Sequence, residues 1–248
     1  MWTSAVFLLT FLLGCASPGA GAENSPLKVC LISGSNEYRS DVSLSEFQSY
    51  LETHFNVQCT LLKAQGRLNR RGEYGELPGL EALDDSDVAL FFSRRITIQG
   101  EQLEKIKKYC GAGRPIVAVR TASHGFQNWL EFDRVVLGGN YQGHYGETKS
   151  PATYSPAVAQ SHPLLEGVGV IQSLYTLYKN DPVAEDTQVL MTGSTVDGTQ
   201  PAAWTRLHNG GRVFYTSIGG LEDFKNPSFM RLLVNALFWT ARREVEPK

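Results

Sequence analysis

The chain has 248 residues, with 23 Lys and Arg against 25 Asp and Glu, a formal net charge of −2, and 42% apolar residues. This composition is that of an ordinary folded protein, and it excludes a disordered chain, a fibre and a disulfide scaffold. The nearly balanced charge gives no electrostatic reason to expect nucleic-acid binding. The length suits one large domain or two small ones.

Residues 1–22 differ from the rest because they carry no charged side chain. Their apolar segment, Ala5–Gly14, has about ten residues, which is too short for a membrane-spanning helix and typical of a signal-peptide core. Two alternatives remain open: cleavage after Ala22, or lipidation of Cys15 in a segment that resembles a bacterial lipobox. We therefore expect 1–22 to be a signal peptide or lipoprotein leader, and the protein to be exported: periplasmic, extracellular or lipid-anchored at the cell envelope.

Removal of the leader leaves Cys30, Cys59 and Cys110 of the 4 cysteines. An odd number argues against a full disulfide framework. Cys30 and Cys59 fall in two neighbouring predicted strands and could pair. The favoured interpretation is three buried thiols that act as small apolar side chains.

The first half of the mature chain alternates buried strands with amphipathic helices, which predicts an α/β fold with a doubly wound, mostly parallel sheet and flanking helices. The predicted strands are Leu27–Ser33, Val57–Leu62, Asp87–Ser93 and Pro115–Arg120; the predicted helices are Ser43–Phe55 and Gln102–Cys110, with a loop at Arg67–Gly79. Ligands bind at the carboxyl ends of the strands in such folds. The candidate edge therefore comprises Gly34–Arg39, Ser93–Ile96 and Arg120–Phe126.

The second half of the chain is less regular. Residues 127–186 are rich in Gly and Pro, and we expect irregular structure there. Three extended runs follow, Thr187–Thr192, Pro201–Leu207 and Arg212–Ser217, and Asn209-Gly210-Gly211 is a hairpin signal between the last two. Phe229–Ala241 has the apolar spacing of a closing helix. Since no linker or repeat interrupts the chain, a single domain is expected.

Several short motifs occur in a specific order along this pattern. Glu37-Tyr38-Arg39 follows the first strand and Arg120-Thr121-Ala122-Ser123-His124 follows the fourth, and the later motifs are Phe132-Asp133, Gly138–Tyr145, Ala203–Arg206, Gly211–Ser217 and Phe229–Trp239. Together they resemble the ThuA-like (trehalose-utilisation) family over residues 27–242. The resemblance implies the flavodoxin-like fold of class I glutamine amidotransferases, and substrates that are small sugars or oxidised sugar derivatives.

The residues nevertheless argue against glutaminase chemistry. A class I amidotransferase needs a Cys nucleophile on the turn after a strand, activated by a His-x-Glu motif. The strand that lines up with the nucleophile strand ends at Arg120, and Gly220-Leu221-Glu222 lines up with His-x-Glu, so only Glu222 remains. The Gly at position 220 also departs from ThuA-like proteins, which commonly have a His near it.

His124, His144 and Glu222 are the candidate catalytic residues, with the histidines moving a proton and Glu222 in support. The alternative for His124 is a hydrogen-bonded structural role. Ser123 and His124 are adjacent, so we expect their side chains to diverge rather than to form a nucleophile–base pair. Two histidines with Glu37 or Glu222 could bind a metal, but their spacing is not compact, and neither a metal nor another cofactor is expected.

Arg120 could clamp an oxygen-rich group, or could form an internal ion pair with Glu37 or Glu222. Aromatic and polar side chains between Asn140 and Tyr145 suit a sugar, which stacks on rings and bonds through its hydroxyls, although they could also simply hold their own loop. The predicted substrate-binding residues are Glu37, Tyr38, Arg39, Arg120, Ser123, Asn140, Tyr141 and Tyr145.

Two functions remain open at this point. The first is an exported protein that acts on a small sugar or an oxidised sugar derivative in carbohydrate utilisation. The second is a non-catalytic carbohydrate-binding, sensing or envelope-associated interaction module. The expected partner in both is a saccharide, with no nucleic acid and with no oligomeric state predicted.

Overall fold

The computed structural model describes residues 25–67, 74–146, 151–157 and 162–248. The predicted leader with Cys15, and residues 68–73 of the predicted Gly- and Arg-rich loop, lie outside these ranges. In the part of the chain that is described, no helix is both long and apolar enough to cross a membrane.

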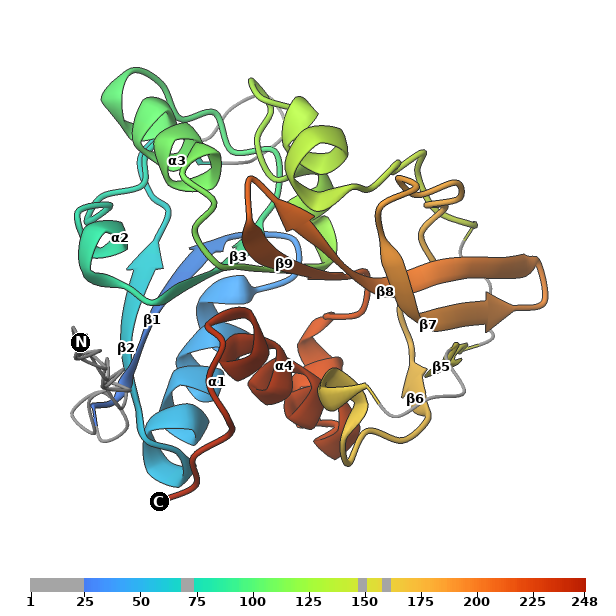
Figure 1. Cartoon of the computed structure of the whole chain (residues 1–248). Helices are drawn as coiled ribbons and strands as arrows, with labels where there is room; N and C mark the ends of the chain where they lie inside the picture. The colour runs from blue at the N-terminus through green and yellow to red at the C-terminus, as the bar shows by residue number, and fades with distance from the viewer. Residues whose placement is uncertain (1–24, 68–73, 147–150, 158–161) are drawn as a thin grey trace, which may run out of the picture.

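A nine-stranded sheet in the order β2-β1-β3-β4-β9-β8-β7-β5-β6 runs through the described residues (Figure 1). The first five strands in this order pair in parallel and form what we call the parallel half: β2 (Val57–Lys63), β1 (Leu27–Gly34), β3 (Val88–Ser93), β4 (Ile116–Val119) and β9 (Gly211–Thr216). The other four pair antiparallel and form the antiparallel extension: β8 (Gly198–His208), β7 (Gln188–Thr195), β5 (Ala152–Pro156) and β6 (Ile171–Ser173).

The strands at the centre of the parallel half are buried on both faces. Every residue of β3 and β4 is buried, as expected for continuous apolar runs covered by helices on both sides. The predicted α/β fold is confirmed, but the sheet is mixed rather than mostly parallel. The difference arises because β8 follows β7 through a tight turn, which forces antiparallel pairing.

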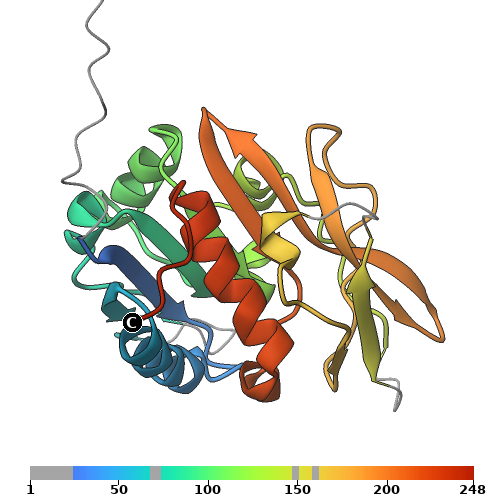
Figure 2. The same cartoon turned by 60° about the horizontal axis from the view of Figure 1, so that its bottom comes forward.

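Helices cover the two faces of the parallel half (Figures 1 and 2). One face carries α1 (Ser40–His54) and α4 (Pro227–Thr240), whose apolar side chains join one core cluster with β1 and β3. The other face carries α2 (Ala82–Asp85) and α3 (Glu101–Gly111) in a second cluster. The sequence locates α4 well because Asn226 caps it, accepting from the backbone N–H of Ser228 at 2.9 Å, and a Pro follows at the first position.

The described residues of 127–186 form more regular structure than expected. They contain a π-helical turn (Phe132–Leu137), a short 3-10 helix (Pro163–Leu165) and the strands β5 and β6. These elements are three to six residues long, too short to show a hydrophobic period.

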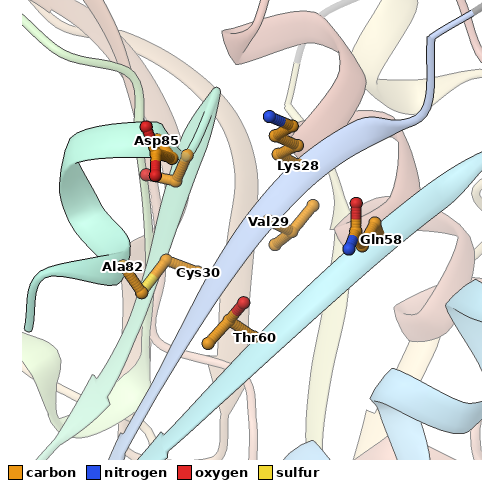
Figure 3. A pocket seen from close by; sticks show the side chains of 8 residues that line it. Lys28, Val29, Cys30, Gln58, Thr60, Ala82 and Asp85 are labelled. Carbon is orange, nitrogen blue, oxygen red and sulfur yellow. The ribbon is translucent and has the colours of Figure 1, made fainter. Parts of the chain in front are cut away.

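The cysteines Cys30, Cys59 and Cys110 are free thiols, so the alternative of a Cys30–Cys59 disulfide is wrong. Cys59 pairs in register with Val29 rather than with Cys30, and side chains alternate along a strand, so the two cysteines lie on opposite faces of the sheet. Burial raises the pKa of Cys30 and Cys110 to about 12, which makes both inert. Cys30 borders a hollow of about 240 Å³ beside Lys28, Thr60 and Asp85 (Figure 3), and this hollow offers no reactive thiolate.

Candidate functional site

The chain makes a sharp turn where β4 ends. Arg120 has φ of 47°, in the left-handed region, and begins a 3-10 helix over Arg120–His124. A non-glycine residue in this region is strained and persists only when its surroundings hold it. Strained strand-to-helix turns present the nucleophile in α/β-hydrolases. Here the turn is present, but its side chain is a guanidinium.

The Arg120 side chain points inward and is fully buried. Its Nη1 donates to the Ser217 carbonyl at 2.8 Å, and its Nη2 donates to the Tyr38 hydroxyl at 3.2 Å and the Thr176 carbonyl at 3.4 Å. Three tyrosine rings surround it, and we call them the tyrosine cage. The distance from the guanidinium carbon to the ring centroid is 4.6 Å for Tyr38, 5.2 Å for Tyr175 and 4.7 Å for Tyr178. Cation–π contacts of this kind strengthen when they are desolvated. Arg120 therefore connects, inside the protein, the segments that contain Tyr38, Thr176 and Ser217.

The predicted ion pair between Arg120 and Glu37 or Glu222 is wrong. Glu37 pairs with Arg94 instead, and Glu222 is exposed and pairs with Lys225 at 2.9 Å. Carbonyl and hydroxyl oxygens satisfy most of the buried guanidinium, while both glutamates remain at the surface. The supporting role of Glu222 beside the histidines remains a prediction.

Tyr175 occupies the space of a side chain at position 220. A Cβ added to Gly220 would lie 1.8 to 2.3 Å from three atoms of the Tyr175 ring, which is far too close. The backbone of Gly220 is extended, so this close approach, and not a positive φ, requires the glycine. The Tyr175 ring thus excludes any larger side chain at position 220.

The buried carboxylate near this turn is Asp223, which the sequence analysis missed. Its Oδ2 accepts from the N–H groups of Gly219 and Gly220, at 3.1 and 2.8 Å, and from the Ser173 hydroxyl at 3.0 Å. Burial raises the pKa of Asp223, and these hydrogen bonds and Arg120 partly oppose the rise. The sequence did contain a hint of this role. Asp223 lies three residues after Gly220, at the start of a short helix, where an acidic side chain caps the first turn.

His124 lies in the same turn and is only 6% exposed. Its ring stacks on Tyr141 with centroids 4.3 Å apart and an interplanar angle of 19°. Burial, and then the charges of Arg95, Arg94 and Arg120, hold the pKa of His124 well below its usual value. The imidazole is therefore neutral at neutral pH and acts as a hydrogen-bond partner rather than as a cation.

The expectation that the side chains of Ser123 and His124 diverge is wrong. Ser123 Oγ lies 3.1 Å from His124 Nδ1, and it is also 3.4 Å from the Arg120 carbonyl. Both side chains are enclosed in one tight turn, and Nδ1 is the ring nitrogen nearest the backbone, so neighbouring residues can meet. The Ser123 hydroxyl can donate to either acceptor.

Asp133 fixes the loop that carries Tyr141. Its Oδ2 accepts from the Tyr141 N–H at 2.8 Å, and its carbonyl accepts from the Gly139 N–H at 3.0 Å. A Cβ on Gly139 would lie 2.1 Å from Asp133 Oδ1, so only glycine fits against this carboxyl group. Burial raises the pKa of Asp133 to about 6. The position of Tyr141 thus depends on a buried acid of another segment, and not only on side chains of its own loop.

The remaining predicted residues are less centrally placed. His144 is exposed, with Nδ1 2.7 Å from the Tyr145 carbonyl, and it faces His124 closely enough to lower the pKa of that residue. The Tyr145 hydroxyl accepts from Gln200 of the antiparallel extension at 3.1 Å. Arg39 is exposed and pairs with Asp41 at 3.2 Å, and Asn140 is partly buried. The structure thus brings Tyr38, Arg120, Ser123, His124, Tyr141 and His144 toward one edge.

No group of three or more His, Cys, Asp or Glu side chains that could hold a metal ion occurs among the residues that the structure describes.

The described residues thus form an α/β protein with a mixed sheet and a strained, non-glycine turn after β4. The family model described as trehalose utilisation, ThuA, matches residues 28–240. The chain therefore belongs to the ThuA family, and this prediction from the sequence is confirmed.

Solved structures agree with this assignment. A ThuA-like protein from Parabacteroides merdae has a TM-score of 0.67 at 16% identity, covering 90% of this chain and 93% of that chain. One from Bacteroides uniformis has a TM-score of 0.65 at 17% identity, covering 91% and 95%. A cytoplasmic protein from Salmonella typhimurium has a TM-score of 0.59 at 15% identity, covering 90% and 100%. At such identities the likeness shows the fold alone. No curated protein matches the sequence.

Proposed function

We propose that this ThuA family protein binds a small saccharide or an oxidised sugar derivative, in carbohydrate utilisation, at the edge where β1, β3 and β4 end. The observation that carries the proposal is the neutral His124 stacked on the partly exposed Tyr141. A neutral imidazole accepts a hydrogen bond from a sugar hydroxyl, and an aromatic ring packs against the apolar face of a sugar. The family's link to trehalose utilisation supports the same class of ligand.

The order of the parallel half also supports this location. Its sequence β2-β1-β3-β4-β9 corresponds to the flavodoxin-like strand order, in which ligands bind outside the carboxyl ends of the strands where the order reverses. That reversal falls between β1 and β3, beside Glu37, Arg94 and Arg95. The charged and polar groups there suit a ligand rich in oxygen atoms.

Glutaminase activity is not part of the proposal, because the turn that would present the nucleophile holds the buried Arg120 and Tyr175 fills the space beside it. A thiolate is the nucleophile in that reaction, and burial raises the pKa of all three free thiols among the described residues.

Titration calorimetry with trehalose, glucose and gluconate tests the binding proposal. We expect saturable binding of at least one of them, weakened about tenfold by His124→Ala and by Tyr141→Leu, since each change removes one hydrogen bond or one stacking contact. His54→Ala is the matched control, because the His54 ring also lies beside a tyrosine ring, that of Tyr50 with centroids 4.6 Å apart, but on the surface of α1. Absence of heat with every saccharide, or equal losses in the control, would overturn the proposal.

A catalytic form of this function rests on the contact between Ser123 Oγ and His124 Nδ1. It would make Ser123 a nucleophile toward an esterified sugar, with His124 taking its proton. The low pKa of His124 weakens it as a base, so binding without turnover is favoured. Hydrolysis of acetylated glucose that disappears in Ser123→Ala would establish the enzyme, and no release of acetate would support the binding module.

We also propose export, on the basis of the short apolar segment Ala5–Gly14, which has the length of a signal-peptide core. The intact mass of the secreted chain separates the two alternatives: cleavage after Ala22, or a lipid on Cys15. A full-length mass in the cytoplasmic fraction would contradict both.

A further inference from the structure

A second hollow lies at the other end of the strands from the saccharide edge, near the amino end of β9 and the carboxyl end of α4. Residues 241–248 run back from α4 toward α1, where the Asn56 N–H donates to the Glu246 carbonyl at 2.9 Å (Figure 2). The hollow beside α4 and this tail has a volume of about 730 Å³. A hollow of this size can accommodate a small molecule.

Four arginines line this space, and we call it the arginine hollow: Arg212, Arg231, Arg242 and Arg243. Arg243 is neutralised by Glu246 at 2.9 Å. The other three form no ion pair with any carboxylate of the described residues. Burial and the charge of Arg242 lower the pKa of Arg212, as expected when two cations repel each other. Glu166 and Glu244 also line the hollow, so its four arginines face these two carboxylates and Glu246, which leaves a small excess of positive charge.

Each of the three arginines without an ion pair donates to a backbone carbonyl. Arg212 Nη1 donates to the Trp239 carbonyl at 2.8 Å, and the Arg212 guanidinium lies 4.4 Å from the Trp239 ring. Arg242 Nη2 donates to the Gly210 carbonyl at 3.3 Å, and Arg231 Nε donates to the Glu166 carbonyl at 3.2 Å. A guanidinium has five N–H donors, so each of these arginines keeps donors for a ligand.

Asn235 supplies a second, independent observation. Its side chain lines the hollow and is only 3% exposed. Its Nδ2 donates to the carbonyls of Leu164 and Glu166, at 3.1 and 2.9 Å, which fixes the orientation of the amide. Its Oδ1 finds no donor among the described residues and has almost no accessible surface, so a ligand hydroxyl reaches it only after neighbouring side chains move. A buried acceptor without a donor is costly, and a hydroxyl group would satisfy it.

We propose that the arginine hollow binds a small hydroxylated anion, a sugar phosphate or a sugar carboxylate. Arg231 and Arg242 contact its anionic group, and one of its hydroxyls donates to Asn235 Oδ1. The bidentate geometry of guanidinium groups suits both phosphate and carboxylate. This site is separate from the saccharide edge, because Arg212 begins β9 while Ser217, which contacts Arg120, follows its end.

Titration with glucose 6-phosphate, glucuronate, inorganic phosphate and glucose, followed by tryptophan fluorescence and calorimetry, tests the proposal. We expect glucose 6-phosphate or glucuronate to bind saturably, more tightly than inorganic phosphate, with an affinity that falls as salt rises. Arg242→Gln should raise Kd at least tenfold. Arg134→Gln, at another exposed arginine, should leave it unchanged. The fluorescence change should disappear in Trp239→Phe while the calorimetric heat remains.

Three results would overturn the proposal. The first is that neither sugar anion binds saturably. The second is that Arg242→Gln and Arg134→Gln bind equally. The third is that inorganic phosphate binds as tightly as glucose 6-phosphate, since Asn235 would then have no hydroxyl to recognise. If neutral glucose still binds to the Arg242→Gln variant, that binding is assigned to the saccharide edge. It is distinguishable from each of the three results above.

Discussion

The parallel half of the sheet and the antiparallel extension contribute different parts of the candidate site. The parallel half provides the rigid turn at Arg120 and His124. Segments that follow β6 in the antiparallel extension provide the rings of Tyr175 and Tyr178. Arg120 joins the two, because it donates both to the Ser217 carbonyl after β9 and to the Thr176 carbonyl after β6. Both regions therefore contribute rings to the site, Tyr38 after β1 and Tyr175 and Tyr178 after β6, and one buried side chain joins them.

The largest effect is expected from Arg120→Ala, which breaks the connection between the two regions. We expect a loss of about 3–5 kcal/mol in the free energy of unfolding, because the change leaves a cavity and unpaired buried carbonyls. Arg120→Gly should be about 1 kcal/mol less harmful, since glycine adopts a positive φ without strain. Urea unfolding measures both. Equal stability of wild type and Arg120→Ala would show that the two regions are held together otherwise.

The next effect concerns Asp133, which positions Tyr141 from the π-helical turn Phe132–Leu137. Its pKa is raised from the ordinary 3.8 to about 6, so the folded state binds the proton more tightly than the unfolded chain. This contribution to stability is fully present below pH 3.8 and is lost as pH rises through about 6. It amounts to about 3 kcal/mol. Unfolding measured from pH 4 to 8 should show this decline in wild type and a flatter profile in Asp133→Asn. Parallel profiles would contradict the assignment.

Gly220→Ala tests the contact between the turn after β9 and Tyr175. The added methyl group collides with the ring, and we expect a loss of about 2 kcal/mol, in the range of overpacking. The double variant Gly220→Ala with Tyr175→Ala should lose less than the sum of the two single variants, because removal of the ring removes the collision. Additive losses would mean that the two residues do not compete for one space.

The smallest effect separates two neighbouring acids. Asp223→Ala should cost about 1 kcal/mol, because the N–H groups of Gly219 and Gly220 lose their shared acceptor. Glu222→Ala should leave the unfolding midpoint unchanged, since its ion pair with Lys225 is exposed. If Glu222→Ala lowered stability more than Asp223→Ala, Glu222 rather than Asp223 would be the supporting carboxylate.

The sequence predicts the parallel half well and the antiparallel extension poorly, for a physical reason. Strands such as β3 and β4 are continuous apolar runs between helices, and such patterns are local. The candidate edge and the loss of the nucleophile at Arg120 could therefore be located. The tyrosine cage could not, because Arg120 and its partner Ser217 are separated by 97 positions and Tyr175 follows a three-residue strand. Likewise, whether Glu222 or Asp223 faces inward depends on the tertiary packing of one short helix.

A crystal structure of the protein soaked with the saccharide that binds best in calorimetry would locate the bound sugar. We expect a sugar packed against Tyr141, with a hydroxyl within hydrogen-bond distance of His124 and with Arg120 still enclosed by its tyrosine cage. A sugar bound elsewhere, with His124 and Tyr141 untouched, would contradict this expectation.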